Sequence, residues 1–219
     1  IALTHQLVYV PCHRSHVDYL LLSYVIFHEG LALPYIAAGN NLNMPIIGRL
    51  LRGGGAFFIR RSFRDNPLYA TVLKQYLHQL VDMGVPIEYF IEGGRSRTGR
   101  LLKPKLGMLS MTVDSWIKTQ HKPMAFIPVY IGYEKLMEGH SYIGELYGRK
   151  KQKESFFNAI KSILSLKGQF GQVTTRFGVP IILGDLLSRH HPTWFNETQT
   201  DYQHSDWYRS AVADLSRQI

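Results

Sequence analysis

Cysteine is almost absent from this sequence, and long hydrophobic runs are absent altogether. The single cysteine, Cys12, excludes an internal disulfide and suits a reducing compartment. The longest apolar run, interrupted only by a serine, covers residues 19–27. It falls far short of the roughly 20 residues that a membrane-spanning helix needs. We find no internal repeat, low-complexity tract, interdomain linker or targeting signal.

Acidic side chains are scarce beside basic ones. The 219 residues include 16 Asp and Glu against 25 Lys and Arg, for a net charge of +9. This excess indicates an anionic partner, which could be nucleic acid, a phosphorylated small molecule, a nucleotide-containing cofactor or an anionic membrane surface. Ten of the basic residues lie in two short stretches, five in 49–64 and five in 95–105.

The hydrophobic content, 45%, is enough for a sizeable core, so we expect one domain over residues 1–219. The chain begins at Ile1 without an initiator methionine and closes on an open amphipathic pattern, so we expect a segment of a longer protein.

Strand-like runs alternate with helical patterns, which predicts an α/β fold with a mostly parallel central sheet flanked by helices. The runs that read as strands are residues 7–10, 33–37, 56–60, 87–91, 125–133 and 173–183. Helices are predicted at 15–28, 67–83, 106–119, 154–166 and over the final dozen residues. The helix at 67–83 is the clearest, with Asn66 and Pro67 to start it and Gly84 to end it.

The segment from His13 to Asp18 carries the clearest chemical signal. Ser15 and Asp18 have the spacing of a capping box, which would place His13 in extended chain just before a helix. From there the imidazole could fold back over the first turn, and Asp18 could accept the proton of one ring nitrogen. The pair then reads as a general base with its orienting acid.

Other interpretations of this segment stay open. Asp18 could merely cap the helix beside an ordinary loop histidine. His13, His16 and Asp18 could begin a metal site, although no cluster of cysteine or glutamate completes a ligand set. Cys12 adjoins His13 but would point to the opposite face of an extended chain, so we expect it in the core.

Two basic, glycine-rich segments follow or flank predicted strands. After the strand at 87–91 come Glu92, Gly93, Arg95 and Arg97, in a loop that suits a phosphate at the carboxyl end of a strand. A solvated basic turn is the alternative.

The second segment has glycines at 53–55 before a strand and Arg60 and Arg61 after it. Neighbouring residues of a strand point to opposite faces, so only one of these arginines is expected to reach a ligand. Just upstream, residues 45–52 are a candidate for a short basic amphipathic helix, which could rest on a membrane, line an acyl pocket or pack in the core.

Four blocks of the sequence, in this order, resemble the glycerolipid acyltransferase family. They are His13-x4-Asp18, residues 55–61, residues 90–97 and residues 127–129, and together they span most of residues 8–133. The strings at 10–16 and 130–134 resemble in particular the bacterial membrane-associated branch that acylates glycerol 3-phosphate. After about residue 183 the resemblance gives little.

This resemblance implies transfer of a fatty acyl group from acyl-CoA or acyl-carrier protein to the 1-hydroxyl of glycerol 3-phosphate, giving lysophosphatidic acid. It also implies a peripheral position on the cytoplasmic face of the inner membrane, against its anionic surface, with neither a cofactor nor a metal. His13 would be the base and Asp18 its orienting acid. The residues expected to bind the acceptor are Arg60, Arg61, Glu92, Gly93, Arg95, Arg97 and Lys105. Glu92 would contact a glycerol hydroxyl or orient an arginine, and Pro128 and Val129 would shape the acyl-donor channel.

Three alternatives remain at this stage. The acceptor could be dihydroxyacetone phosphate, which differs by a carbonyl. The chain could be a non-catalytic module that binds anionic lipid or nucleic acid, although nucleic acid is not expected because the basic clusters lack a stripe of exposed aromatics. A metal-dependent phosphohydrolase is the third.

Overall fold

The computed structural model describes residues 1–60, 66–136, 171–196 and 200–219. The strands in these ranges are β1 (Gln6–Pro11), β2 (Tyr35–Gly39), β3 (Ala56–Ile59), β4 (Ile87–Glu88), β5 (Met124–Tyr133), β6 (Val173–Phe177) and β7 (Ile181–Ile182). The helices are α1 (Asp18–His28), α2 (Ile47–Gly53), α3 (Pro67–Asp82), α4 (Leu106–Thr119), α7 (Leu183–His190) and α8 (Asp206–Gln218).

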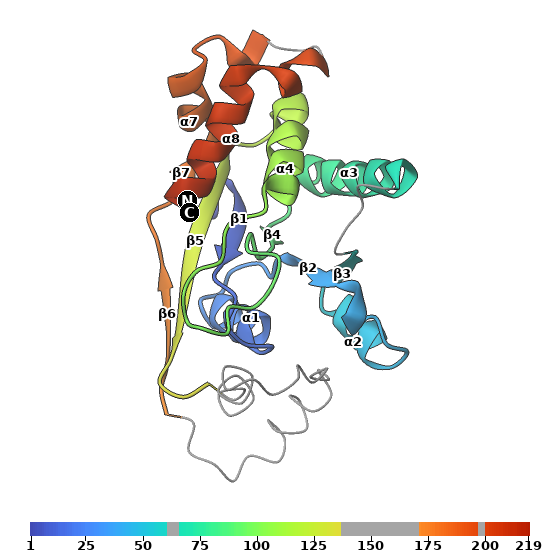
Figure 1. The fold of residues 1–219 in the computed structure, drawn as a ribbon, viewed down its shortest axis with the longest axis vertical. Helices are drawn as coiled ribbons and strands as arrows, with labels where there is room; N and C mark the ends of the chain where they lie inside the picture. The colour runs from blue at the N-terminus through green and yellow to red at the C-terminus, as the bar shows by residue number, and fades with distance from the viewer. Residues whose placement is uncertain (61–65, 137–170, 197–199) are drawn as a thin grey trace.

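The strands form one sheet in the order β3-β2-β4-β1-β5-β6, with β7 also paired to β5. Strands β1 to β5 pair in parallel, and β6 and β7 join β5 antiparallel. The predicted α/β fold with a mostly parallel sheet is therefore confirmed (Figure 1).

Helices cover both faces of the sheet, and β1 lies in its interior. Val8 and Val10 of β1 belong to the larger core, which residues of α3, α4, α7 and α8 complete. Leu7 and Tyr9 point the other way and pack with residues of α1. Strand β1 is buried along its whole length, as expected of a parallel strand covered on both faces. Its carboxyl end therefore has little freedom to move.

Local sequence signals set the ends of α3 as predicted. The Asn66 side chain accepts a hydrogen bond from the Tyr69 backbone N–H at 2.9 Å, and Pro67 occupies the first turn. Beyond the end of the helix, Gly84 has a φ of +65°, which glycine adopts without strain.

The predicted single strand at 173–183 is wrong. The segment forms two short strands, β6 and β7, and Leu183 already begins α7. Between them Pro180 has no backbone N–H to offer a ladder, while the Gly178 N–H donates to the Pro128 carbonyl at 2.8 Å. Strand β4 is also shorter than the predicted 87–91. The helix predicted at 154–166 lies outside the described residues.

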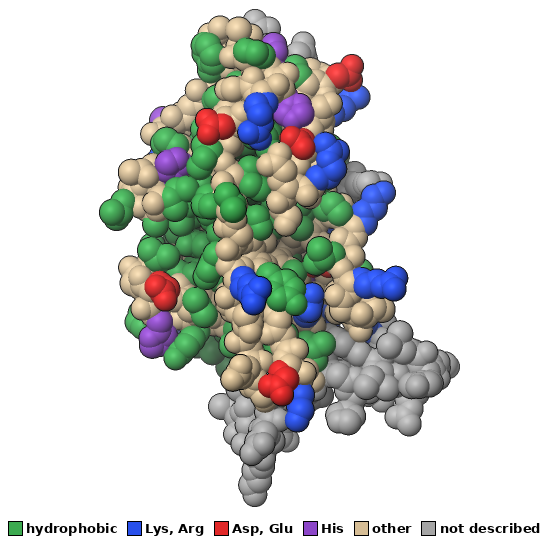
Figure 2. Space-filling model, turned by 90° about the vertical axis from the view of Figure 1, so that its left-hand side faces the viewer, with side chains coloured by type: hydrophobic (Ala, Val, Ile, Leu, Met, Phe, Trp, Pro, Cys, Tyr) green, Lys and Arg blue, Asp and Glu red, His purple; other side chains and the backbone are tan. Residues whose placement is uncertain are grey.

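Strand β6 forms an exposed edge of the sheet. Val173 and Phe177 of this strand and the nearby Val179 are exposed. Figure 2 views the molecule from this side and shows hydrophobic side chains gathered over much of it. No described helix combines the length and the hydrophobicity that crossing a bilayer would require.

Glu88 is an unusual residue for the middle of a sheet. It lies on β4 between β1 and β2, is fully buried, and neither of its carboxyl oxygens has a hydrogen-bond partner among the described residues. Burial first, and the negative charge of Asp18 second, raise the pKa of the Glu88 carboxyl well above its usual value. The fold therefore favours the neutral acid here.

Replacing this acid by an amide, Glu88→Gln, should stabilise the folded chain by an amount that grows with pH. The pKa of Glu88 is higher in the folded chain than in the unfolded chain, where it is near 4.5. The stability that Glu88 contributes is therefore fully present below pH 4.5 and is lost as the pH rises through the folded-state pKa. Glutamine has no proton to lose, so the gain should reach about 1.4 kcal/mol per pH unit across that interval.

Urea unfolding of both proteins at about pH 5 and pH 8 measures this difference. Glu29→Gln, at an exposed glutamate after α1, is the matched control and should leave the pH dependence unchanged. A Glu88→Gln protein with the same pH dependence as the parent would show that Glu88 is already ionised in the fold.

Candidate active site

His13 and Asp18 meet where β1 passes into α1. His13 lies two residues beyond the end of β1, and Asp18 is the first residue of α1. His13 Nδ1 is 2.9 Å from Asp18 Oδ2; the Asp18 side chain is fully buried and that of His13 is 16% exposed. The ring folds back over the start of the helix as predicted. Nε2 is the ring nitrogen on the side away from this contact.

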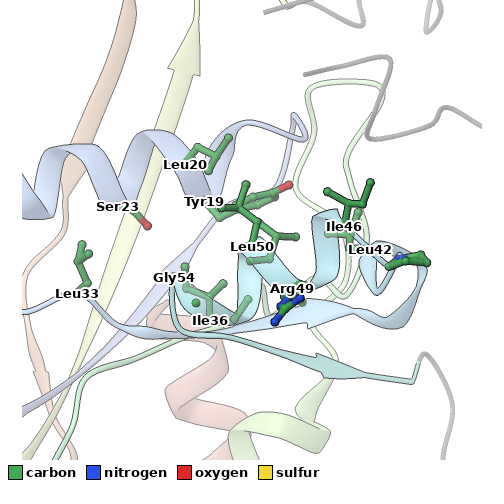
Figure 3. A pocket seen from close by; sticks show the side chains of 15 residues that line it. Tyr19, Leu20, Ser23, Leu33, Ile36, Leu42, Ile46, Arg49, Leu50 and Gly54 are labelled. Atoms are coloured by element: carbon green, nitrogen blue, oxygen red, sulfur yellow. The ribbon is translucent and has the colours of Figure 1, made fainter. Parts of the chain in front are cut away.

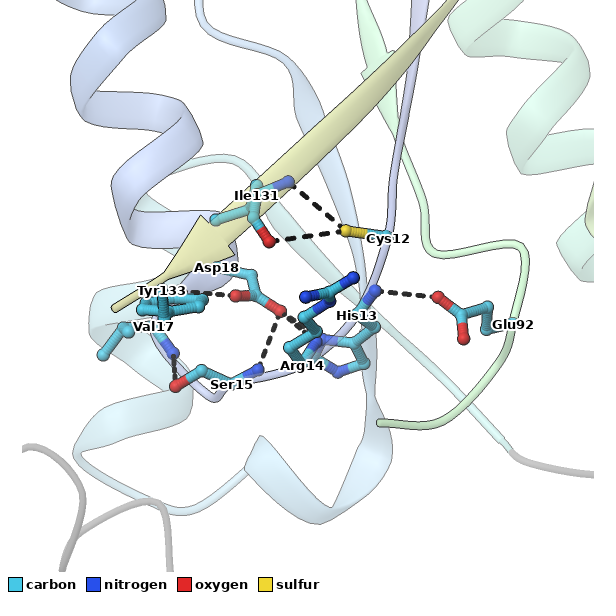
Figure 4. A network of polar contacts seen from close by, with 9 residues as sticks. All are labelled: Cys12, His13, Arg14, Ser15, Val17, Asp18, Glu92, Ile131 and Tyr133. Carbon is cyan, nitrogen blue, oxygen red and sulfur yellow. Dashed lines mark hydrogen bonds and ion pairs between the residues drawn. The ribbon is translucent and has the colours of Figure 1, made fainter. Parts of the chain in front are cut away.

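The Asp18 carboxylate also organises the chain around it (Figure 4). Its Oδ2 accepts the backbone N–H groups of Arg14 at 2.7 Å and Ser15 at 2.9 Å. Its Oδ1 accepts the hydroxyl of Tyr133 at 2.5 Å. A buried carboxylate needs such donors to remain charged. The backbone between His13 and α1 therefore takes its shape from hydrogen bonds to the Asp18 carboxylate.

The helix begins later than predicted. Residues 15–17 form a turn, Val17 is the N-cap and α1 starts at Asp18 rather than at Ser15. Half of the expected capping box is present, since the Ser15 N–H donates to Asp18, while Ser15 Oγ accepts from the Val17 N–H at 3.4 Å. The N–H groups of residues 14 and 15 point to the Asp18 carboxylate, and residues 15–17 form a turn instead of the first turn of the helix.

Glu92 holds the backbone of His13 in place. One of its oxygens accepts the His13 N–H at 2.9 Å, and the other accepts the Leu102 N–H at 2.7 Å. The side chain is almost fully buried. Through these contacts Glu92 fixes the backbone of His13. Its expected contact with a glycerol hydroxyl or an arginine stays a prediction.

Phe90 fixes the His13 ring from one side. The two rings stack with centroids 4.0 Å apart and an angle of 30° between their planes. Phe90 also packs against the hydrophobic cluster of Tyr19, Ile36 and Leu42. The ring of His13 thus lies one aromatic side chain away from that cluster.

The basic loop after β4 runs beside His13. The Ser96 N–H donates to the His13 carbonyl at 2.7 Å, and Arg95 and Arg97 flank Ser96 in the sequence. Both arginines are partly exposed while Ser96 is buried. The structure therefore brings two of the predicted phosphate-binding residues to the immediate neighbourhood of the dyad.

Lys105 and Gly93 lie together in the same loop. Gly93 has a φ of +62°, and a Cβ placed on it would lie 2.7 Å from Lys105 Cδ. The absence of a side chain at Gly93 thus lets the lysine cross the loop closely. The Lys105 N–H donates to the Ile91 carbonyl at 2.8 Å, which anchors the end of the loop just before α4.

Arg60 is placed apart from this group. It follows β3, which is three positions from β1 in the sheet, or about 14 Å at the usual strand spacing. Its guanidinium lies 4.9 Å from the ring centre of Tyr69 on α3. The structure therefore does not bring Arg60 together with Arg95, Arg97 and Lys105. Arg61 lies outside the described residues.

Pro128 and Val129 lie on β5 and pair with the last two residues of β1. Val129 is buried in the core beneath α1, and its carbonyl accepts the Cys12 N–H at 2.9 Å. These residues thus hold the carboxyl end of β1 in place through strand pairing. Cys12 is itself buried, as predicted, and burial raises the pKa of its thiol.

An apolar pocket of about 880 Å³ lies between α1 and α2, above strands β2 and β3 (Figure 3). Its lining includes Tyr19, Leu20, Ile36, Leu42, Ile46 and Leu50, and neither Pro128 nor Val129 belongs to it. Tyr19, Ile36 and Leu42 are the cluster against which Phe90 packs. Phe90 thus contacts both the His13 ring and the cluster that helps to line the pocket. The role of Pro128 and Val129 in an acyl-donor channel stays a prediction.

Within the described ranges, no three His, Cys, Asp or Glu side chains gather in a way that could hold a metal ion. His16, the second histidine of the motif, is buried. The expectation that the chain uses no metal or cofactor stays a prediction.

The contact of Tyr133 with Asp18 is not predicted by the sequence analysis, although the sequence contains a signal for it. Val129, Ile131 and Tyr133 alternate along β5, and the first two are buried in the core beneath α1. The period of two predicts that Tyr133 points to the same face, toward the helix that begins with Asp18.

Comparisons with known proteins show what this chain is similar to. A family model described as Acyltransferase matches residues 1–132, and one described as Glycerol-3-phosphate acyltransferase C-terminal region matches residues 142–219. The glycerol-3-phosphate acyltransferase of Pseudomonas fluorescens (strain Pf-5) is 52% identical over 219 residues, which are 100% of this chain and 26% of that protein. That of Pseudomonas syringae pv. syringae is 53% identical over 220 residues, with the same two shares.

The chain thus spans about a quarter of the length of the curated relatives it matches. Among solved structures, the 1-acyl-sn-glycerophosphate acyltransferase of Thermotoga maritima matches with a TM-score of 0.47 and 16% identity, over 98% of this chain and 66% of that one. The acyltransferase model covers more than half of the chain and contains the dyad, the basic loop and the pocket. This chain belongs to the acyltransferase family.

Proposed function

We propose that this chain transfers a fatty acyl group from a thioester, acyl-CoA or acyl-carrier protein, to the 1-hydroxyl of glycerol 3-phosphate. The product would be lysophosphatidic acid, in the first step of phospholipid synthesis. The observation that carries the proposal is the His13–Asp18 pair set between an arginine-bearing loop and an apolar pocket. The names of the similar Pseudomonas proteins support the choice of acceptor.

In this mechanism His13 is the general base. Asp18 holds the proton on Nδ1, so Nε2 takes the proton of the acceptor hydroxyl as its oxygen attacks the thioester carbonyl. A C–O bond forms, and the tetrahedral adduct then breaks its C–S bond. The proton passes from Nε2 to the departing thiolate, so His13 ends neutral. Neither an acyl-enzyme nor a metal takes part.

Two features near His13, the basic loop and the apolar pocket, suit the two substrates. Arg95, Arg97 and Lys105 supply forked or mobile cationic donors that match a phosphate, and they are held by the loop that binds His13. The pocket beyond Phe90 is lined mainly by apolar side chains and has a volume in the range of ligand sites. It would hold the donor's acyl chain and bring the thioester toward the imidazole.

The first test is thiol release from palmitoyl-CoA, with and without glycerol 3-phosphate and in the presence of a chelator. We expect release that depends on the acceptor, ignores the chelator and exceeds release from acetyl-CoA, which cannot fill the pocket. His13→Ala should lower the rate by at least about 10³-fold because no other group takes the hydroxyl proton.

His5→Ala, at the other end of β1, is the matched control and should keep the parent rate. Release without acceptor would identify a thioesterase instead. Full activity of the His13→Ala protein would refute the assignment of the base.

Replacing Arg97 with alanine should raise the KM for glycerol 3-phosphate by about tenfold or more and leave the KM for the acyl donor nearly unchanged. The reason is that a charged donor to a phosphate contributes roughly 1.5–3 kcal/mol. Steady-state kinetics with each substrate varied in turn measures the two constants. The comparable change Arg60→Ala, at the arginine held against α3, should affect neither, and an unchanged acceptor KM in Arg97→Ala would contradict the role.

We further propose that the chain works on the cytoplasmic face of the inner membrane, with the outer side of α1 and α2 against the lipid. Ile46 and Leu50 are 84% and 74% exposed at the mouth of the pocket, and the exposed Arg49 lies between them. Residues 30–60 contain no Asp or Glu. Apolar side chains beside arginines suit an anionic bilayer surface, from which an acyl chain could enter the pocket.

The double change Ile46→Ser with Leu50→Ser should reduce sedimentation with phosphatidylglycerol vesicles severalfold, since it removes the highly exposed apolar side chains of Leu50 on α2 and of Ile46 just before it. The matched control is Leu68→Ser with Val72→Ser, a pair with the same spacing and similar exposure on α3. Equal vesicle binding by the two double variants would place the lipid contact elsewhere.

A further inference from the structure

The side chain of Tyr133 occupies the one oxygen of Asp18 that the histidine motif does not use. Oδ2 receives His13 Nδ1 and the N–H groups of Arg14 and Ser15, all from the segment next to the helix. Oδ1 receives the Tyr133 hydroxyl at 2.5 Å, from a residue 115 positions further along the chain. Figure 4 shows the two sets of contacts on opposite sides of the carboxylate.

The position of Tyr133 is set by the sheet. It is the last residue of β5, which pairs with β1 on one side and places Tyr133 opposite Val173 of β6 on the other. The preceding residues on the same face, Val129 and Ile131, are buried beneath α1. The hydroxyl is therefore presented to Asp18 by the end of a paired strand, far from the motif in the sequence.

We propose that Tyr133 is a positioning residue for the reaction, acting on His13 through Asp18. A carboxylate held only at Oδ2 can turn about its Cβ–Cγ bond, and each turn misaligns the imidazole that depends on it. A short hydroxyl–carboxylate bond at Oδ1 removes this freedom and stabilises the anion in a buried site. We expect this alignment to affect kcat and neither KM, since neither substrate needs to contact Tyr133. The proposal rests on the proposed function, in which His13 is the base.

Tyr133→Phe removes only the hydroxyl. We expect kcat to fall by about tenfold with both KM values within twofold of the parent, because alignment of the base is lost and substrate contacts are kept. Tyr130→Phe, on the same strand with an exposed side chain, is the matched control and should change kcat less than twofold. Melting curves of the variants confirm that they are folded.

A double-mutant cycle with Asp18→Asn distinguishes positioning from a general structural role. If Tyr133 acts through Asp18, adding Tyr133→Phe to Asp18→Asn should cost less than twofold in kcat. A further tenfold loss in that background would overturn the proposal.

The proton on His13 Nδ1 gives a readout that does not depend on turnover. Its NMR resonance should move or broaden in Tyr133→Phe and stay in place in Tyr130→Phe, whether or not glycerol 3-phosphate is the acceptor. An identical resonance in the parent and in Tyr133→Phe would overturn the positioning role. Absence of acyl transfer by the parent, with the resonance still displaced in Tyr133→Phe, would instead refute the proposed function alone.

Discussion

The site depends on one buried negative charge, the carboxylate of Asp18. Removing a carboxylate from water is costly, and it is tolerated here because four donors converge on it. Two of these are backbone N–H groups that bend the chain between β1 and α1, and one is the ring of His13. The shape of the turn, the start of the helix and the direction of the imidazole are consequences of satisfying the same anion.

A second carboxylate completes the frame around the histidine. Glu92 binds the backbone N–H of His13 on one side and that of Leu102 on the other, and Ser96 returns a hydrogen bond to the His13 carbonyl. The loop that carries Arg95 and Arg97 is thus tied to the base at both of its backbone groups. A phosphate held by that loop would keep a constant distance from the imidazole, which is what transfer to a neighbouring hydroxyl requires.

Much of this arrangement could be predicted from local patterns. The spacing of His13 and Asp18 indicated the folded-back ring, and glycines with arginines after a strand indicated the basic loop at the carboxyl end of the sheet. The position of Arg60 could not be predicted in this way. Arg60 stands in a similar basic motif, but its strand lies at the far edge of the sheet, and an amino-acid pattern carries no information about that order.

The sequence by itself determined most of the helices and strands and the pairing of His13 with Asp18, because helix and strand periods, turns and short-range hydrogen bonds depend on residues close together in the chain. Tertiary structure decided the partners. Glu92 reaches His13 across 79 positions and Tyr133 reaches Asp18 across 115, and the pocket arises only where α1 lies beside α2. Such contacts depend on strand order and helix packing. Sequences with the same local patterns could adopt different strand orders and helix packings.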